Sequence, residues 1–90
     1  MNINEVVFTD SLPKIDLHGF DRDSARVAIN DFIYDNIKMG NQIITIIHGV
    51  GSGIIRKTTA ETLSKNKNVE EFKTDYFNQG CTIVKLKNVR

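Results

Sequence analysis

Two His-Gly pairs contain the side chains of this sequence best suited to acid–base chemistry. The first closes residues 16–19, Asp-Leu-His-Gly, and the second opens residues 48–53, His-Gly-Val-Gly-Ser-Gly. A histidine titrates near neutral pH, and a neighbouring carboxylate can orient the ring and stabilise its charged form. Asp16, His18 and His48 are therefore candidate catalytic residues for a reaction that transfers a proton.

The second His-Gly pair begins a glycine-rich loop that is suited to an anion. A run of β-branched and aliphatic residues at 42–47 predicts a buried strand before the loop, and a helix should start near Ile54. Glycines let another molecule approach the main chain, and the N–H groups and dipole of a helix N-terminus favour negative charge. The loop therefore predicts a phosphate site made of Gly49, Val50, Gly51, Ser52 and Gly53.

Four basic residues stand at the starts of the two predicted helices, where the helix dipole favours acids instead. They are Arg22 and Arg26 in the first helix and Arg56 and Lys57 in the second. A phosphate between the two helix N-termini explains this placement. The net charge is only +1, but residues 1–49 sum to −3 and residues 50–90 to +4, which permits a basic face.

The hydrophobic pattern predicts the order β-α-β-α-β-β. Asp21 is a good N-cap for the first helix and Gly40 a good residue to end it. Both faces of the last strand carry apolar residues, so this strand should lie inside the sheet. The fold class is an α/β two-layer sandwich with two helices and a mixed, mostly parallel four-stranded sheet. The predicted strands are 14–17, 42–47, 69–74 and 81–87, and the helices 22–39 and 54–65.

The topology places the candidate residues together. Strands that are joined through a helix pair in parallel, and their carboxyl ends then meet at one edge of the sheet. Asp16, His18, His48 and the glycine loop should converge there, where open α/β sheets bind their ligands. By strand alternation, Asp16 and His18 should also point to the same face.

Length and composition predict one soluble domain. We expect an N-terminal arm at residues 1–12, with a short edge strand at 5–8, and the folded domain at 13–90. The sequence contains no apolar run near the roughly 20 residues that span a bilayer, and no secretory signal. One cysteine, Cys81, permits no internal disulfide, which suits a cytoplasmic location.

Three common site types do not fit the sequence. Two histidines and one cysteine lack the ligand spacing of a structural zinc site, the glycine spacing is not that of a Rossmann fold, and a P-loop would need Gly-Lys-Ser/Thr. Two roles are open for the aromatic residues Phe8, Phe20, Tyr76 and Phe77. They could stack on bases or pack at the core edge, and packing is the commoner role.

The motifs Ile-Asp-Leu-His-Gly at 15–19 and His-Gly-Val-Gly-Ser-Gly at 48–53, with Gly-Cys-Thr-Ile-Val-Lys-Leu at 80–86, resemble the small MutS-related (Smr) domain over about residues 13–87. The resemblance implies a sandwich similar to the C-terminal domain of bacterial initiation factor three and a domain that binds nucleic acids. Several members nick DNA or cleave RNA, and some act on messages at stalled ribosomes. They occur alone or at the C-terminus of a MutS-like ATPase.

The resemblance implies catalytic roles for Asp16 and His18 and a substrate loop at 48–53. Many relatives have a basic residue where this chain has Val50, and the loop at 75–80 is short and has a single glycine. Two functions stay open: an endonuclease acting on RNA or DNA, with Mg²⁺ or Mn²⁺ as a candidate cofactor held by Asp16, and a binding module for nucleic acid or the ribosome without chemistry. No membrane partner is expected, and the oligomeric state is open.

Overall fold

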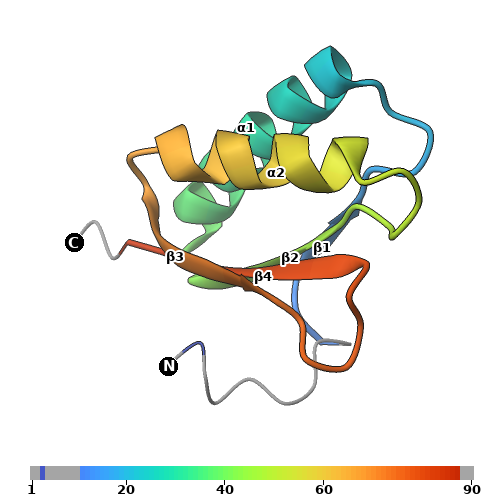
Figure 1. Ribbon diagram of the computed structural model, residues 1–90. Coiled ribbons are helices and arrows are strands. Elements are labelled where there is room, and N and C mark those ends of the chain that lie inside the picture. The colour runs from blue at the N-terminus through green and yellow to red at the C-terminus, as the bar shows by residue number, and fades with distance from the viewer. Residues whose placement is uncertain (1–2, 4–10, 88–90) are drawn as a thin grey trace.

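The computed structural model describes residue 3 and residues 11–87, and the edge strand predicted at 5–8 lies outside this part of the chain. Six elements follow the predicted order β-α-β-α-β-β (Figure 1). Their bounds agree with the predicted ones to within one residue at each end. They are β1 (Lys14–Asp16), α1 (Arg22–Met39), β2 (Ile43–Ile47), α2 (Ile54–Lys65), β3 (Val69–Thr74) and β4 (Cys81–Leu86).

The four strands form one mixed sheet in the order β1-β2-β4-β3. β1 pairs with β2 in parallel, whereas β4 pairs antiparallel with both β2 and β3. The mixed sheet is as predicted, but its pairings are not mostly parallel. The cause is the short hairpin between β3 and β4, which turns β4 back and inserts it between β2 and β3. The interior position predicted for β4 is confirmed.

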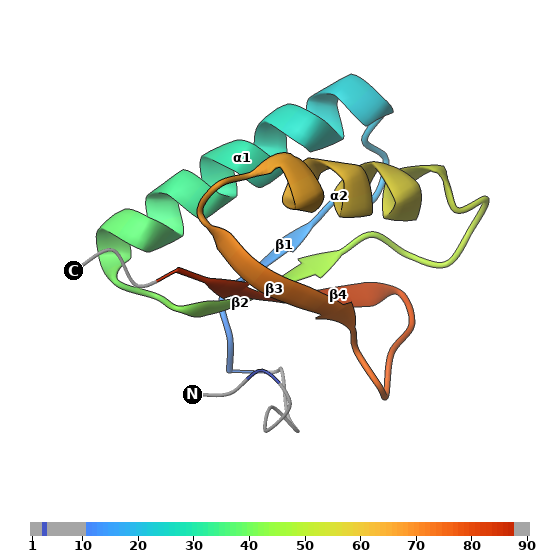
Figure 2. The same cartoon turned by 60° about the vertical axis from the view of Figure 1, so that its left-hand side comes forward.

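Both helices cover the same face of the sheet, which gives two layers (Figure 2). Figures 1 and 2 also show that the two helices start at the same end of the sheet, above the carboxyl ends of β1 and β2. The main core lies between these layers. It contains the buried residues Leu17, Ala25, Ile29, Ile33, Ile44, Ile46, Leu63, Val84 and Leu86.

The other face of the sheet carries a smaller apolar cluster. Ile43 and Ile83 are covered there by Ile3, which is 2% exposed, and Leu12 packs against the same cluster. Cys81 is a buried free thiol near Asp75 at the start of β4. Its burial and the neighbouring carboxylate raise the pKa of the thiol, so Cys81 is protonated near neutral pH.

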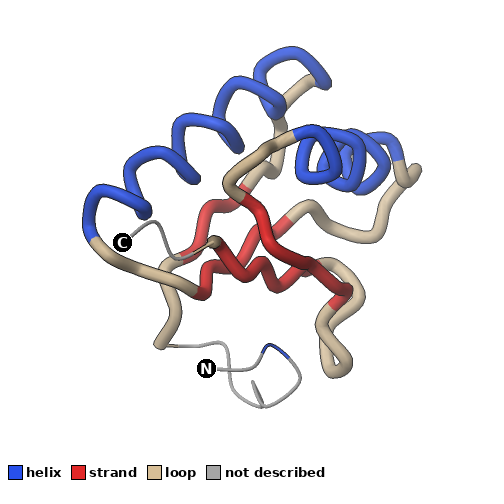
Figure 3. Tube along the Cα trace, turned by 90° about the vertical axis from the view of Figure 1, so that its left-hand side faces the viewer, coloured by secondary structure: helices blue, strands red, loops and turns tan. Residues whose placement is uncertain are grey.

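The ends of α1 show why the chain turns where it does. The Asp21 carboxylate accepts a hydrogen bond of 2.7 Å from the Ser24 N–H, which caps the helix and lowers the pKa of Asp21. Gly40 ends the helix in the left-handed conformation, and its N–H donates to carbonyl groups of the last turn. Figure 3 shows the helix α1 and the loop that follows it as a tube along the Cα trace.

Candidate functional site

The ends of β1 and β2 lie side by side at one edge of the sheet. Asp16 is in register with Ile47, and the Leu17 N–H donates a hydrogen bond of 2.8 Å to the Ile47 carbonyl. The loop after β1, which contains His18, and the loop after β2, which begins at His48, therefore start from neighbouring positions (Figure 1). The structure brings the two His-Gly motifs together as the topology predicts.

Asp16 holds the turn that leads to His18. Its carboxylate accepts a hydrogen bond of 2.9 Å from the main-chain N–H of His18, and both residues are exposed. In the described part of the chain no hydrogen bond joins this carboxylate to the His18 ring. β1 ends at Asp16, so the strand alternation that predicted a shared face does not extend to His18. Asp16 thus positions the His18 backbone and leaves the imidazole open to solvent.

His48, in contrast, is buried, with 9% of its surface exposed. Its Nδ1 lies 2.8 Å from the Gly49 carbonyl oxygen, and its Nε2 lies 2.8 Å from the Thr82 hydroxyl. Because a carbonyl can only accept, Nδ1 carries the hydrogen and, in the neutral ring, Nε2 accepts from Thr82. The ring therefore joins the end of β2 to β4. The catalytic role predicted for His48 is untested, and this geometry favours a structural one.

Gly80, the single glycine of the loop at 75–80, is a site residue to which the sequence alone assigned no role at the site. Its carbonyl accepts from the N–H groups of both His48, at 2.8 Å, and Gly49, at 2.9 Å. A Cβ added to Gly80 would lie 3.3 Å from the Gly49 Cα, tighter than an ordinary contact. The β3–β4 hairpin and the glycine loop are thus joined backbone to backbone. The Gly49 N–H is also already paired, which removes it from the predicted set of phosphate donors.

The start of α2 differs from that of α1. Gly53 is its N-cap with φ +85°, and no side chain caps the helix. The nearest candidate, the Ser52 hydroxyl, lies 3.5 Å from the Ile54 N–H, the outer limit of a hydrogen bond. The first turn of α2 contains no acid, whereas that of α1 contains Asp23. The amides and dipole of α2 are therefore open to an anion from outside the chain.

Two glycines of the loop, Gly51 and Gly53, should respond differently to replacement by alanine. Gly53→Ala must place a side chain at φ +85°, so we expect the free energy of unfolding to fall by about 1 to 2 kcal/mol. Gly51 has no positive φ and open space around its Cβ position, so Gly51→Ala should stay within about 0.5 kcal/mol of the parent. Urea unfolding of both variants checks this, and equal losses would contradict it.

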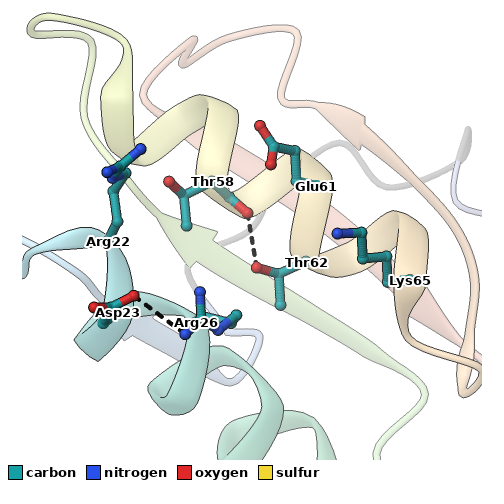
Figure 4. Close-up of a pocket in the computed structure, with 7 residues that line it drawn as sticks. All are labelled: Arg22, Asp23, Arg26, Thr58, Glu61, Thr62 and Lys65. Carbon is teal, nitrogen blue, oxygen red and sulfur yellow. Dashed lines mark hydrogen bonds and ion pairs between the residues drawn. The ribbon is translucent and has the colours of Figure 1, made fainter.

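The four predicted basic residues do not meet in one pocket. Arg22 and Arg26 line a groove of about 280 Å³ between the helices, which Figure 4 shows with its other lining residues, Asp23, Thr58, Glu61, Thr62 and Lys65. Arg26 also pairs with Asp23 at 3.1 Å. Arg56 and Lys57 lie outside that groove lining, exposed on the first turn of α2 beside the glycine loop. Arg56 and Lys57 are therefore the basic residues that lie beside the predicted phosphate site.

Two properties of the described residues limit other site types. No helix among them is long and apolar enough to cross a membrane. Within residue 3 and residues 11–87, no group of three or more His, Cys, Asp or Glu side chains could hold a metal ion.

The fold and the site define an α/β sandwich whose paired His-Gly loops meet at one sheet edge. The Smr domain model matches residues 15–87, and the chain belongs to this family. It is 32% identical over 81 residues to Endonuclease MutS2 of Alkaliphilus metalliredigens and 38% identical over 77 residues to that of Lactobacillus helveticus. These matches cover 87% and 82% of the chain, which spans 10% of the length of each relative.

Solved structures agree with this assignment. The Smr domain of Thermus thermophilus MutS2 superposes with a TM-score of 0.82 at 25% identity, covering 84% of this chain and 99% of that domain. YdaL, a stand-alone small MutS-related protein from Escherichia coli, has the same fold, with a TM-score of 0.78 at 23% identity over 82% of this chain and 63% of its own. The predicted α/β sandwich with two helices and a mixed four-stranded sheet is confirmed.

Proposed function

We propose that this domain binds nucleic acid and cleaves phosphodiester bonds as an endonuclease, with RNA or DNA as substrate. The observation that carries the proposal is the meeting of two loops at one sheet edge. One loop presents the exposed His18, and the other leads into the uncapped N-terminus of α2. Membership of the Smr family and relatives named Endonuclease MutS2 support the same conclusion.

Cleavage needs a deprotonated nucleophile, a protonated leaving oxygen and stabilisation of the charge on the phosphoryl group. His18 is the group proposed to move the proton, because its exposed imidazole lies at this edge and an imidazole ring has nitrogen atoms that can accept and donate a proton. On RNA the nucleophile would be the neighbouring 2′-OH, and on DNA a water molecule. Asp16 holds the main chain of His18, and it is the residue proposed to bind Mg²⁺ or Mn²⁺ if the reaction uses a divalent ion.

The phosphate is proposed to lie against the glycine loop. Donors there are the main-chain amides of Gly51 to Gly53, the N-terminus of α2 and the Arg56 side chain, while the Gly49 amide is engaged with Gly80. Donors that are fixed before the reaction stabilise developing charge without reorganisation, which usually contributes most to catalysis. Arg22 and Arg26 in the interhelical groove would contact more distant phosphates.

A binding module without chemistry is the second candidate, for nucleic acid or the ribosome. The Asp16 carboxylate is engaged by a main-chain N–H, and the exposed Val50 replaces a basic residue in the loop. Both functions require phosphate contacts, so binding should weaken steeply with salt. We expect a slope of about −2 to −3 in log affinity against log salt, which corresponds to roughly three phosphates. A flat dependence would indicate a protein partner instead.

A cleavage assay separates the two candidates. Single-stranded RNA, duplex RNA and supercoiled DNA are each incubated with Mg²⁺, with Mn²⁺ or with chelator, and the products are resolved on gels. We expect cut products from one class of substrate. Binding without any cut product, in all metal conditions, would replace the endonuclease with the binding module.

The wider role belongs to the same proposal. Cleavage of mRNA at stalled ribosomes would follow from an RNA substrate, and control of DNA repair or recombination from a DNA substrate. A cytoplasmic location is part of the same proposal, because both kinds of substrate would have to be accessible to the protein. The substrate found in the cleavage assay therefore decides between the two roles.

A further inference from the structure

Exposed apolar side chains gather at the site edge. The described part of the chain has eight large hydrophobic residues that are exposed, and three of them lie on α1. The other five lie on the loops around the candidate site or at the first residue of α2. They are Phe20, Val50, Ile54, Tyr76 and Phe77.

Two of these residues project from a hairpin loop that is fixed by its own hydrogen bonds. The Asp75 carboxylate accepts from the Phe77 N–H at 3.0 Å, and the Asn78 side-chain oxygen accepts from the Gly80 N–H at 2.9 Å. The Cys81 N–H donates to the Asn78 carbonyl at 3.0 Å. The buried Asp75 and the exposed Asn78 thus both use their side chains to bond the backbone of the loop, while Tyr76 and Phe77 are 86% and 73% exposed.

The two rings contact each other edge to face. Their centroids are 5.0 Å apart and their planes make an angle of 80°. We call this pair the aromatic ledge. In this arrangement the edge of one ring meets one face of the other, and the high exposure of both residues shows that the remaining ring surface is open to a flat partner. Packing at the core edge, the commoner role for such residues, is excluded for both rings by their exposure.

The ledge is joined to the proposed phosphate site. The carbonyl of Gly80, at the end of the same loop, accepts hydrogen bonds from the N–H groups of His48 and Gly49. Figure 1 shows the β3–β4 hairpin loop and the loop after β2 on the same side of the molecule. A strand with a phosphate at the glycine loop has bases on either side of that phosphate, and the hairpin that carries the ledge is bonded to the start of the same loop.

We propose that the aromatic ledge stacks on unpaired bases, which makes single-stranded or locally unpaired nucleic acid the substrate class of this domain. This inference depends on the proposed function and specifies its substrate. Every base has a face that can stack on an aromatic ring, but in a duplex the neighbouring bases cover those faces. Arg56 and Lys57 at the start of α2 supply positive charge for the backbone of such a strand.

Binding of matched oligonucleotides tests the ledge. Tyr76→Ala/Phe77→Ala is compared with its parent, both in a His18→Ala background so that cleavage does not follow binding. The probes are a short single strand, the same strand with abasic sites in place of its bases, and its duplex, each as RNA and as DNA. Tyr34→Ala is the matched control, because Tyr34 is an aromatic residue of α1 that is 60% exposed.

We expect the double variant to bind the intact single strand at least about fivefold more weakly, the lower limit for losing one stacked base. Affinity for the abasic strand and the duplex should stay within about twofold, and Tyr34→Ala should change none of the three. Replacement by other aromatic residues, Tyr76→Phe/Phe77→Tyr, should restore binding. Unchanged thermal melting shows that all variants are folded.

Three outcomes would overturn the inference. Equal losses for intact and abasic strands would mean that the rings support the loop or contact the backbone. Unchanged affinity for every probe would mean that the ledge docks another partner, such as a protein. In that case nucleic-acid binding by the parent would still support the proposed function. If the parent binds no probe at all, the proposed function and the ledge are both wrong.

Discussion

His18→Ala should lower the rate of phosphodiester cleavage by about 10² to 10⁴-fold, the usual contribution of a general acid or base. The side chain is exposed, and Asp16 holds the loop through the main-chain N–H of His18 and not through the ring, so little else should change. We expect the free energy of unfolding to stay within about 0.5 kcal/mol of the parent and nucleic-acid affinity within about twofold. Single-turnover cleavage, urea unfolding and equilibrium binding measure these three quantities.

Asp16→Asn is the matched control for that prediction. The asparagine oxygen can still accept the His18 N–H, so the turn is kept while the negative charge is removed. If cleavage is kept in Asp16→Asn but lost in His18→Ala, Asp16 only positions the main chain of His18. Loss in both would show that the charge is needed, for the ring or for a divalent ion. Full activity of His18→Ala would refute the proton-transfer assignment.

His48→Ala should act on stability instead. The substitution leaves the Gly49 carbonyl and the Thr82 hydroxyl without the partner that they share, and it opens space at a buried position. Leaving the buried Thr82 hydroxyl unsatisfied costs about 1 to 3 kcal/mol, and removing a buried ring adds a loss of packing, so we expect the free energy of unfolding to fall by about 2 to 4 kcal/mol. In a domain of this size that corresponds to a fall in Tm of roughly 10 to 25 °C, measured by circular dichroism.

A double-mutant cycle with Thr82→Val separates this contact from general damage. If the ring and the hydroxyl stabilise each other, the two substitutions together should cost less than the sum of the single ones, by about 0.5 kcal/mol or more. A His48→Ala protein with parental stability and no cleavage would contradict the structural role and restore the catalytic one.

The pattern of the sequence determined the elements and the place of the site. Apolar periodicity, the Asp21 cap and the Gly40 stop are local signals, and they predicted both helices and all four strands. Two strands joined through a helix run in parallel for chiral and steric reasons, so the meeting of the His-Gly motifs at one edge also followed from the sequence. The apolar residues on both faces of β4 placed that strand inside the sheet.

Only the tertiary structure decided what each site residue does. The His48 ring hydrogen-bonds to Thr82, 34 residues away, and the Gly80 carbonyl accepts hydrogen bonds from the main-chain N–H groups of His48 and Gly49. No local pattern specifies such pairs, because they depend on β4 entering beside β2. The exposure of Tyr76 and Phe77 likewise goes with a loop whose backbone N–H groups are bonded to the side chains of Asp75 and Asn78. Sequence periodicity reports which residues can be buried, whereas long-range hydrogen bonds determine which polar groups are paired and which are exposed to a ligand.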